Sequence, residues 1–143
     1  MKKRINNINQ FIENPIKTQQ TVIEYLIKKG EKTEFGEEHK FQNITNYNDF
    51  CQLVPIRTYE EISPYIEKVR NGSANVLWPG KIKWFAKSSG TTNSKSKFIP
   101  ISKESLHDCH FKGGKDMLSL YENNFPKINI YNGKGLMLGG AIK

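Results

Sequence analysis

Residues 84–102 read WFAKSSGTTNSKSKFIPIS, a segment rich in glycine, serine, threonine and lysine that lies between two short apolar runs. In the segment KIKWFAK, Ile82, Trp84 and Ala86 fall on one face, opposite Phe85 and the lysines, and this alternation predicts a β-strand. The following run FIPI reads as a second short strand, whose proline favours the edge of a sheet. The stretch therefore predicts a strand, a polar loop and a second strand.

The loop between the two strands permits two interpretations. A tightly turning backbone exposes consecutive N–H groups that can hold an anion, Gly90 lets a phosphate approach the main chain, and Lys95 and Lys97 can neutralise its charge. The hydroxyl groups that would add donors belong to Ser88, Ser89, Thr91, Thr92, Ser94 and Ser96. The nucleotide-binding pattern GxxxxGK[ST] is absent, and hydroxyl-rich segments also occur in ordinary hairpins, so both a phosphate loop and a plain turn stay open.

The first part of the chain, residues 1–77, reads as a set of short helices. Apolar residues recur at helical spacing in residues 5–12 and 22–27, separated by Pro15, and Gly30 should end the second helix. The segment TEFGEEHKF reads as a turn-rich connector. Three further helix starts are expected, at Thr45, at Thr58 with Glu61 in a capping box, and at Ser63 with Pro64 in the first helical position.

Residues 78–143 predict the order strand, phosphate loop, strand, helix and strand. Ser102 can cap a long helix that runs to about Asn123, with Glu104 in its first turn. Residues 134–140 read as a further strand. Helices followed by strands indicate a mixed α/β (α+β) fold whose sheet begins after residue 77.

The composition is that of a globular chain with one domain. In 143 residues, 22 Lys and Arg against 14 Asp and Glu give a net charge of +8, which suits either an anionic partner or a lysine-rich surface in water. The same two interpretations apply to the strand lysines Lys81, Lys83 and Lys87. Cys51 and Cys109 have no CxxC spacing, and no apolar run approaches a membrane span, so we expect a cytoplasmic protein without a membrane partner.

Two features of the predicted helix after residue 102 have a functional and a structural interpretation. His107, Cys109 and His110 are potential metal ligands, but no second pair completes a zinc site, so a helix with a half-buried cysteine is the simpler interpretation and no metal site is predicted. Gly113 and Gly114 either let the helix pack closely on the sheet or leave room for a substrate.

The segment SSGTTNSKSKFIP resembles the phosphate-binding signature of acyl-adenylate-forming enzymes, in which Ser/Thr-Ser-Gly-Thr-Thr precedes a lysine. More narrowly, four segments are similar to bacterial members of the auxin-responsive acyl-acid amido synthetase family: TEFG, VPIRTYEEISPYIE, LWPGKIKWFAKSSGTTNSKSKFIPIS and HFKGGKDMLSLY. The similarity extends from about Thr33 to Gly140. It implies the large adenylating domain of that superfamily, of which residues 1–143 would be the N-terminal part.

The resemblance also implies a two-step reaction with ATP and Mg²⁺. A carboxylic acid is activated as acyl-AMP, and an amine or amino acid then displaces AMP to form an amide; the protein stabilises charge on phosphoryl oxygens. By match to the motif, the residues that would bind ATP are Ser88, Ser89, Gly90, Thr91, Thr92 and Lys97. The helix after the loop helps to line the acyl pocket in the family, which makes His110 and Phe111 pocket candidates.

Members of the family are several times longer than 143 residues, so the resemblance implies that this chain is incomplete and inactive by itself. The acidic residue associated with Mg²⁺ and a mobile C-terminal subdomain would lie beyond residue 143. Two alternatives remain: an inactive folded remnant, and a small basic nucleic-acid-binding module with Trp84, Phe85 or Phe98 as stacking platforms. No recognised nucleic-acid motif is visible, so nucleic acid is not the expected partner.

Overall fold

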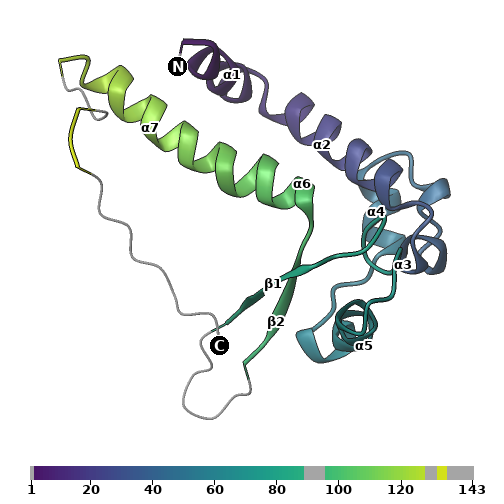
Figure 1. The fold of residues 1–143 in the computed structure, drawn as a ribbon. Coiled ribbons are helices and arrows are strands. Elements are labelled where there is room, and N and C mark those ends of the chain that lie inside the picture. The colour runs from purple at the N-terminus through teal and green to yellow at the C-terminus, as the bar shows by residue number, and fades with distance from the viewer. Residues whose placement is uncertain (1, 89–95, 128–131, 135–143) are drawn as a thin grey trace.

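A computed structural model describes residues 2–88, 96–127 and 132–134 of the chain. Most of them are helical, and one two-stranded antiparallel sheet lies between the helices of the first part and a long helix near the end (Figure 1). This confirms the predicted mixed α/β class, with helices first and strands afterwards. In chain order the elements are α1 (Lys2–Glu13), α2 (Pro15–Gly30), α3 (Glu34–Glu38), η1 (Phe41–Asn43), α4 (Tyr47–Leu53), α5 (Tyr59–Arg70), β1 (Trp84–Lys87), β2 (Phe98–Ile101), α6 (Lys103–Ser105), η2 (Leu106–Phe111) and α7 (Lys112–Asn124).

The break between α1 and α2 confirms the predicted effect of Pro15. Asn14 separates the two helices, and Pro15 occupies the start of α2, where its missing N–H leaves no hydrogen bond unmade. Gly30 was expected to stop α2 from just outside, but it is the last residue of the helix, and Glu31 follows in a right-handed conformation. The reason for a glycine here is packing, because a Cβ on Gly30 would lie 3.0 Å from the ring of Phe41.

The prediction that TEFGEEHKF is a turn-rich connector is wrong, since this segment contains the helix α3 and the start of η1. Thr33 is buried and begins α3, because its hydroxyl accepts a hydrogen bond from the N–H of Gly36 at 3.0 Å. Gly36 fits only because it has no side chain, as an added Cβ would overlap the carbonyl oxygen of Gly30. Glycine at this position therefore serves close packing and not a turn.

The capping box at the start of α5 is confirmed. The hydroxyl of Thr58 accepts from the N–H of Glu61, and the Glu61 carboxylate accepts from the N–H of Thr58 at 2.6 Å. The cap of α4 is Asn46 rather than Thr45, since the Asn46 side chain accepts from two backbone N–H groups of the first turn. Thr45 instead donates its own N–H and hydroxyl to Asp49.

No new helix begins at Ser63 and Pro64; both lie inside α5. A proline in this position cannot donate to the carbonyl of Glu60, four residues earlier. The hydroxyl of Ser63 donates to that carbonyl at 2.9 Å. A side chain thus supplies the missing donor, and α5 continues to Arg70.

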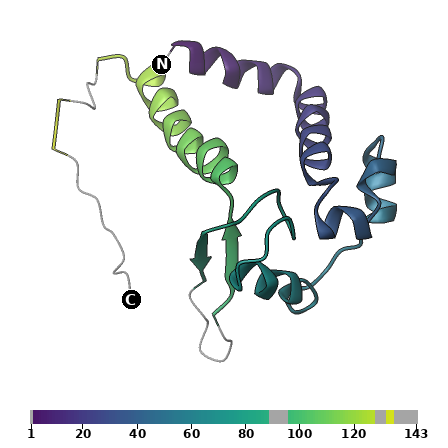
Figure 2. The ribbon, with the colours of Figure 1, turned by 45° about the vertical axis from the view of Figure 1, so that its right-hand side comes forward.

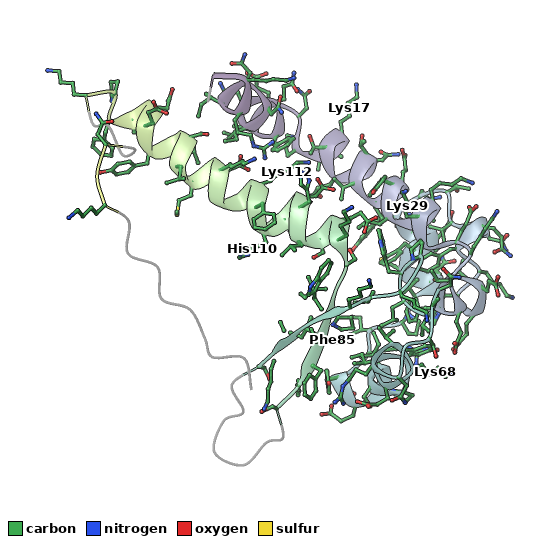
Figure 3. All side chains as sticks on the ribbon, in the orientation of Figure 1. Lys17, Lys29, Lys68, Phe85, His110 and Lys112 are labelled. Carbon is green, nitrogen blue, oxygen red and sulfur yellow. The ribbon has the colours of Figure 1, made fainter. Side chains whose placement is uncertain are left out.

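The sheet is a hairpin in which β1 pairs with β2, with Phe85 opposite Pro100. The predicted apolar face of β1 is wrong: Trp84 and Ala86 are exposed, whereas Phe85 is half-buried (Figure 3). Phe85 packs against a small core of Tyr65, Val69 and Val76, which Phe35, Ile62, Leu77 and Ile82 extend. The side of the strand that faces α5 therefore decides which residue is buried.

After the hairpin, Ser102 caps the next helix as predicted, since its hydroxyl accepts from the N–H of Ser105 at 3.0 Å. The helix continues through α6, a π-helical segment η2 and α7 to Asn124. The side chain of Arg4 in α1 forms two hydrogen bonds with Asp116 in α7. These bonds join the first helix to the last described one, and Figure 2 shows the ribbons of the two helices near each other at the N-terminus. The expected strand at residues 134–140 lies outside the described residues except for Lys134.

Candidate functional site

The two ends of the predicted phosphate loop meet at the tip of the hairpin. The N–H of Ser88 donates to the carbonyl of Lys97 at 2.9 Å, and the N–H of Lys97 donates to the hydroxyl oxygen of Ser88, also at 2.9 Å. These reciprocal bonds bring together the first and last of the predicted ATP-binding residues. The other four lie outside the described residues: Ser89, Gly90, Thr91 and Thr92.

Ser88 and Lys97 present a donor and a cation at the base of the loop. The Ser88 oxygen accepts from Lys97, which leaves the hydroxyl hydrogen of Ser88 able to donate to an anion. The Lys97 ammonium lies 3.8 Å from the Glu60 carboxylate and 5.0 Å from the centre of the Tyr59 ring. Its side chain is 42% exposed, so this surface ion pair holds the ammonium only weakly and a phosphate can compete for it.

Helix α5 holds the strand that leaves the loop. The hydroxyl of Tyr59 accepts from the N–H of Phe98 at 2.9 Å and donates to the Phe98 carbonyl at 3.3 Å. The guanidinium of Arg70 lies 4.0 Å from the centre of the Phe98 ring. Neither residue was predicted from the sequence, because a capping segment and a helix C-terminus carry no sign of a partner as far as 39 residues away in the chain.

A partly buried polar cluster joins α5 and the residue before its cap to α3. The Nδ1 of His39 lies 2.8 Å from the carbonyl oxygen of Phe35, and its Nε2 lies 3.0 Å from the guanidinium of Arg57. A carbonyl only accepts, so Nδ1 carries the proton and the neutral ring accepts from Arg57. The hydroxyl of Tyr65 donates to Glu38, which raises the pKa of Tyr65 above its usual value. The cluster positions the N-terminal end of α5, which reaches the loop.

His110 and Phe111, the predicted pocket residues, lie in η2 with their rings 5.5 Å apart, edge to face. Both are exposed, and Figure 3 shows His110 on the side of the long helix that faces away from α1 and α2. The described residues do not enclose them in a pocket. Their role as pocket residues therefore stays a prediction.

The neighbouring features of this helix are solvent-facing as well. An added Cβ on Gly113 or Gly114 would meet no atom of the described residues within 4 Å, so the close packing suggested for these glycines is not present there. Cys109 is exposed, not half-buried. Among the described residues, no group of three or more His, Cys, Asp or Glu side chains is placed to hold a metal ion.

The three aromatic residues of the nucleic-acid alternative do not form a stacking surface. Phe85 packs against the core, and Arg70 covers one face of the Phe98 ring. Trp84 is 50% exposed and is the one of the three that offers a bare ring. The arrangement gives this alternative no support.

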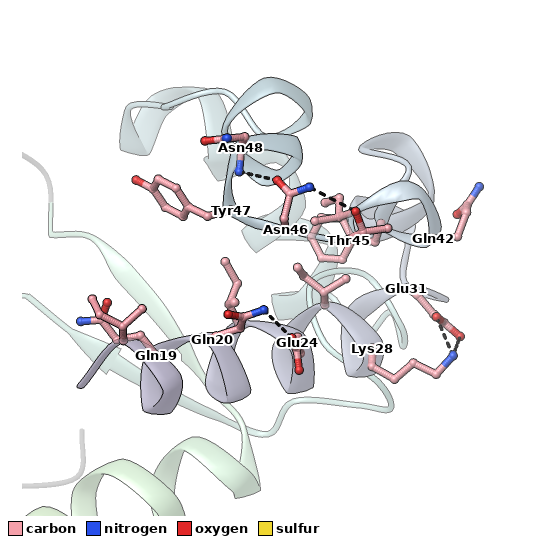
Figure 4. Close-up of a pocket in the computed structure, with 15 residues that line it drawn as sticks. Gln19, Gln20, Glu24, Lys28, Glu31, Gln42, Thr45, Asn46, Tyr47 and Asn48 are labelled. Atoms are coloured by element: carbon pink, nitrogen blue, oxygen red, sulfur yellow. Dashed lines mark hydrogen bonds and ion pairs between the residues drawn. The ribbon is translucent and has the colours of Figure 1, made fainter. Parts of the chain in front are cut away.

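Two open grooves run along α2, and neither was predicted from the sequence. The larger, of about 940 Å³, lies between α2 and the segment 41–48, and its lining includes the apolar residues Ile23, Phe41 and Ile44. Amide and charged side chains, among them Gln20, Glu24 and Lys28, also line it (Figure 4). The second, of about 580 Å³, includes Leu26 and Trp78. No described helix is long and apolar enough to cross a membrane.

Trp78 and Glu104 connect the second groove to the helix after the hairpin. The Trp78 indole N–H donates to the Glu104 carboxylate at 3.0 Å. The Glu104 backbone N–H, together with the Trp78 indole, lowers the pKa of Glu104 below its usual value. The contact fixes the start of α6 relative to the residues that precede β1.

Comparison with known proteins identifies relatives over nearly the whole chain. The model of the GH3 family N-terminal domain matches residues 4–141. The chain is 27% identical over 140 residues to the indole-3-acetic acid-amido synthetase GH3.2 of Arabidopsis thaliana. This alignment covers 94% of this chain and 24% of that protein. It is 28% identical over 133 residues to the jasmonoyl–L-amino acid synthetase JAR4 of Nicotiana attenuata, covering 88% of this chain and 23% of that protein. The chain thus spans about a quarter of the length of these curated relatives.

Proposed function

This chain belongs to the GH3 family, and from that membership we propose that it is the N-terminal part of an ATP-dependent acyl-acid amido synthetase. One relative is named an amido synthetase of indole-3-acetic acid, and the other a jasmonoyl–L-amino acid synthetase. By analogy, the substrates here are a small carboxylic acid and an amine or amino acid. The exposed, unpaired thiols of Cys51 and Cys109 fit a reducing compartment, and we place the protein in the cytoplasm.

The proposed reaction has two steps. A carboxylate oxygen of the acid attacks the α-phosphorus of ATP, the bond to the β-phosphate bridge breaks, and pyrophosphate leaves. The amine nitrogen then attacks the acyl carbon, the acyl–oxygen bond breaks, AMP leaves, and the nitrogen loses a proton. Since negative charge moves between phosphoryl oxygens in the first step, the protein must present fixed donors and a cation to the phosphates.

The geometry at the base of the loop carries the proposal. Among the described residues, no acceptor takes the hydroxyl hydrogen of Ser88, and the Lys97 ammonium at the other end of the loop has only Glu60 as a charged partner. A hydroxyl donor and a nearby ammonium suit a phosphate oxygen, so these two residues fit an ATP phosphate. Ser89, Gly90, Thr91 and Thr92 would complete the contacts. We expect the Mg²⁺ ligand to lie outside these 143 residues.

Acid-dependent exchange of labelled pyrophosphate into ATP tests the proposal, because the first step is reversible. The protein that carries this sequence is incubated with ATP, Mg²⁺ and a panel of acids that includes indole-3-acetic acid and jasmonic acid. We expect exchange with at least one acid and none without acid. A protein that shows no exchange with any acid, and whose melting temperature ATP does not raise, would contradict the proposal.

A further inference from the structure

The backbone of Phe98 points away from the strand with which β2 pairs. In an antiparallel pair, residues that exchange hydrogen bonds alternate with residues whose N–H and C=O groups face outward. The bond from the Ser88 N–H to the Lys97 carbonyl makes these two a hydrogen-bonded pair. The next pair, Lys87 and Phe98, is therefore the non-bonded kind, and the polar groups of Phe98 face the open edge.

One side chain satisfies both of these outward groups. The Tyr59 hydroxyl accepts from the Phe98 N–H at 2.9 Å and donates to the Phe98 carbonyl at 3.3 Å, as a neighbouring strand would do. Further along the same edge, Pro100 is again an outward position, where its missing N–H costs no ladder bond. Tyr59 therefore fixes the outer edge of β2 at Phe98.

The ring of Tyr59 also contacts the residue before Phe98. The Lys97 ammonium lies over it, 5.0 Å from its centre, in the geometry of a cation–π contact. Tyr59 is itself fixed, because it is the first residue of α5 and follows the Thr58 cap directly. One rigid residue therefore sets both the backbone at the exit of the loop and the place of its lysine.

We propose that Tyr59 is a positioning residue of the phosphate site: its hydroxyl fixes the Lys97–Phe98 backbone, and its ring guides the Lys97 ammonium. The part of this inference that concerns ATP rests on the proposed function. The contact with Phe98 does not. Glu60, the neighbour of Tyr59, contributes the opposing charge that keeps the ammonium at this end of the loop until a phosphate arrives.

Tyr59→Phe tests the inference, because it removes the hydroxyl and keeps the ring. Tyr25→Phe is the matched control, since Tyr25 also has a lysine over its ring, at 5.8 Å, and its hydroxyl has no hydrogen-bond partner among the described residues. In Tyr59→Phe the amide of Phe98 should exchange with solvent about tenfold faster, as expected for loss of an ordinary hydrogen bond, while amides in α2 keep their rates. Unchanged protection of Phe98 would overturn the proposal.

The second measurement is the KM for ATP in pyrophosphate exchange. A positioning role predicts that Tyr59→Phe raises this KM several-fold and leaves the rate at saturating ATP near that of wild type, whereas Tyr25→Phe changes neither. An unaltered KM together with faster exchange at Phe98 would overturn the role in ATP binding. If the wild-type protein shows no exchange with any acid and ATP does not raise its melting temperature, the proposed function fails, and the Phe98 amide alone decides the structural role of Tyr59.

Discussion

Side-chain hydroxyls complete the backbone hydrogen bonding of this protein where regular structure is interrupted. The Ser63 hydroxyl donates to the Glu60 carbonyl, for which Pro64 has no N–H to offer. The Ser88 hydroxyl oxygen accepts from the N–H of Lys97 at the other end of the loop. The Tyr59 hydroxyl forms hydrogen bonds with both the backbone N–H and the carbonyl of Phe98. A buried or half-buried backbone group without a partner is costly, so these hydroxyls stabilise a helix and a hairpin that lack some of their regular bonds.

Gly36 is the residue whose substitution should destabilise the fold most clearly. A Cβ in Gly36→Ala would overlap the backbone carbonyl of Gly30, which has no flexible end that can move aside. We expect the free energy of unfolding to fall by about 3 kcal/mol, the upper range for overpacking. Gly113→Ala is the control: it lies in open space on a helix, and it should raise the free energy by up to about 1 kcal/mol.

Urea denaturation of the two variants measures the difference directly. Loss of stability in Gly113→Ala of the same size as in Gly36→Ala would contradict the account. It would also show that some part of the protein packs on the face of α7 that the described residues leave open.

At the scale of elements, the sequence could predict what depends on neighbours along the chain. The capping box at Thr58, the cap at Ser102 and the break at Pro15 are local, and all three are confirmed. The buried side of β1 and the continuity of α5 through Pro64 depend on contacts between distant residues, and both predictions were wrong. The hairpin itself was predicted because alternation and a polar loop are again local signals.

An ion pair joins α1 to α7. Arg4 and Asp116 form a two-bonded contact between the two helices, and their side chains are 21% and 25% exposed. The hydrogen bonds from Arg4 lower the pKa of Asp116 below its usual value. Because the charged carboxylate is favoured in the folded state, its contribution is present at neutral pH and is lost as the pH falls through this lowered pKa.

Asp116→Asn should therefore weaken the docking of α1 at neutral pH but not in acid. We expect a loss of about 1 kcal/mol at pH 7, since the pair is partly exposed, and a difference from wild type that shrinks below a pH of about 4. Hydrogen exchange of the α1 amides at pH 7, and urea denaturation at both pH values, measure it. Asp108→Asn is the control, because Asp108 pairs with Lys112 within one helical stretch; if it loosens α1 equally, the ion pair is not the cause.

At the scale of the whole molecule, the described part of the chain buries few of its large apolar side chains. Five large apolar side chains of the described residues are buried, whereas fifteen are exposed, many of them on α2 and α7. Two of these exposed residues, Val22 and Leu26, line the second groove along α2, and exposed apolar grooves usually contact other polypeptide or a ligand. Together with the coverage of about a quarter of the relatives, this supports the proposal that residues 1–143 form part of a larger adenylating domain.

The motif of the candidate site could be predicted from the sequence, but the residues that position the loop could not. The Ser-Ser-Gly-Thr-Thr pattern and its lysine lie within one short segment, so the phosphate loop could be predicted by resemblance, and the structure brings its ends Ser88 and Lys97 together. The roles of Tyr59 and Arg70 arise only when α5 packs beside β2, a contact that no short pattern encodes.

Pyrophosphate exchange by matched variants of the whole protein tests the central claim, that residues 88–97 hold the phosphates of ATP. Thr91→Ala and Lys97→Ala each remove one proposed phosphate contact, whereas Lys87→Ala removes an exposed lysine of β1 outside the motif. The account predicts that exchange falls several-fold or more in the first two variants and stays at the wild-type rate in Lys87→Ala. Wild-type exchange rates in both Thr91→Ala and Lys97→Ala would contradict it.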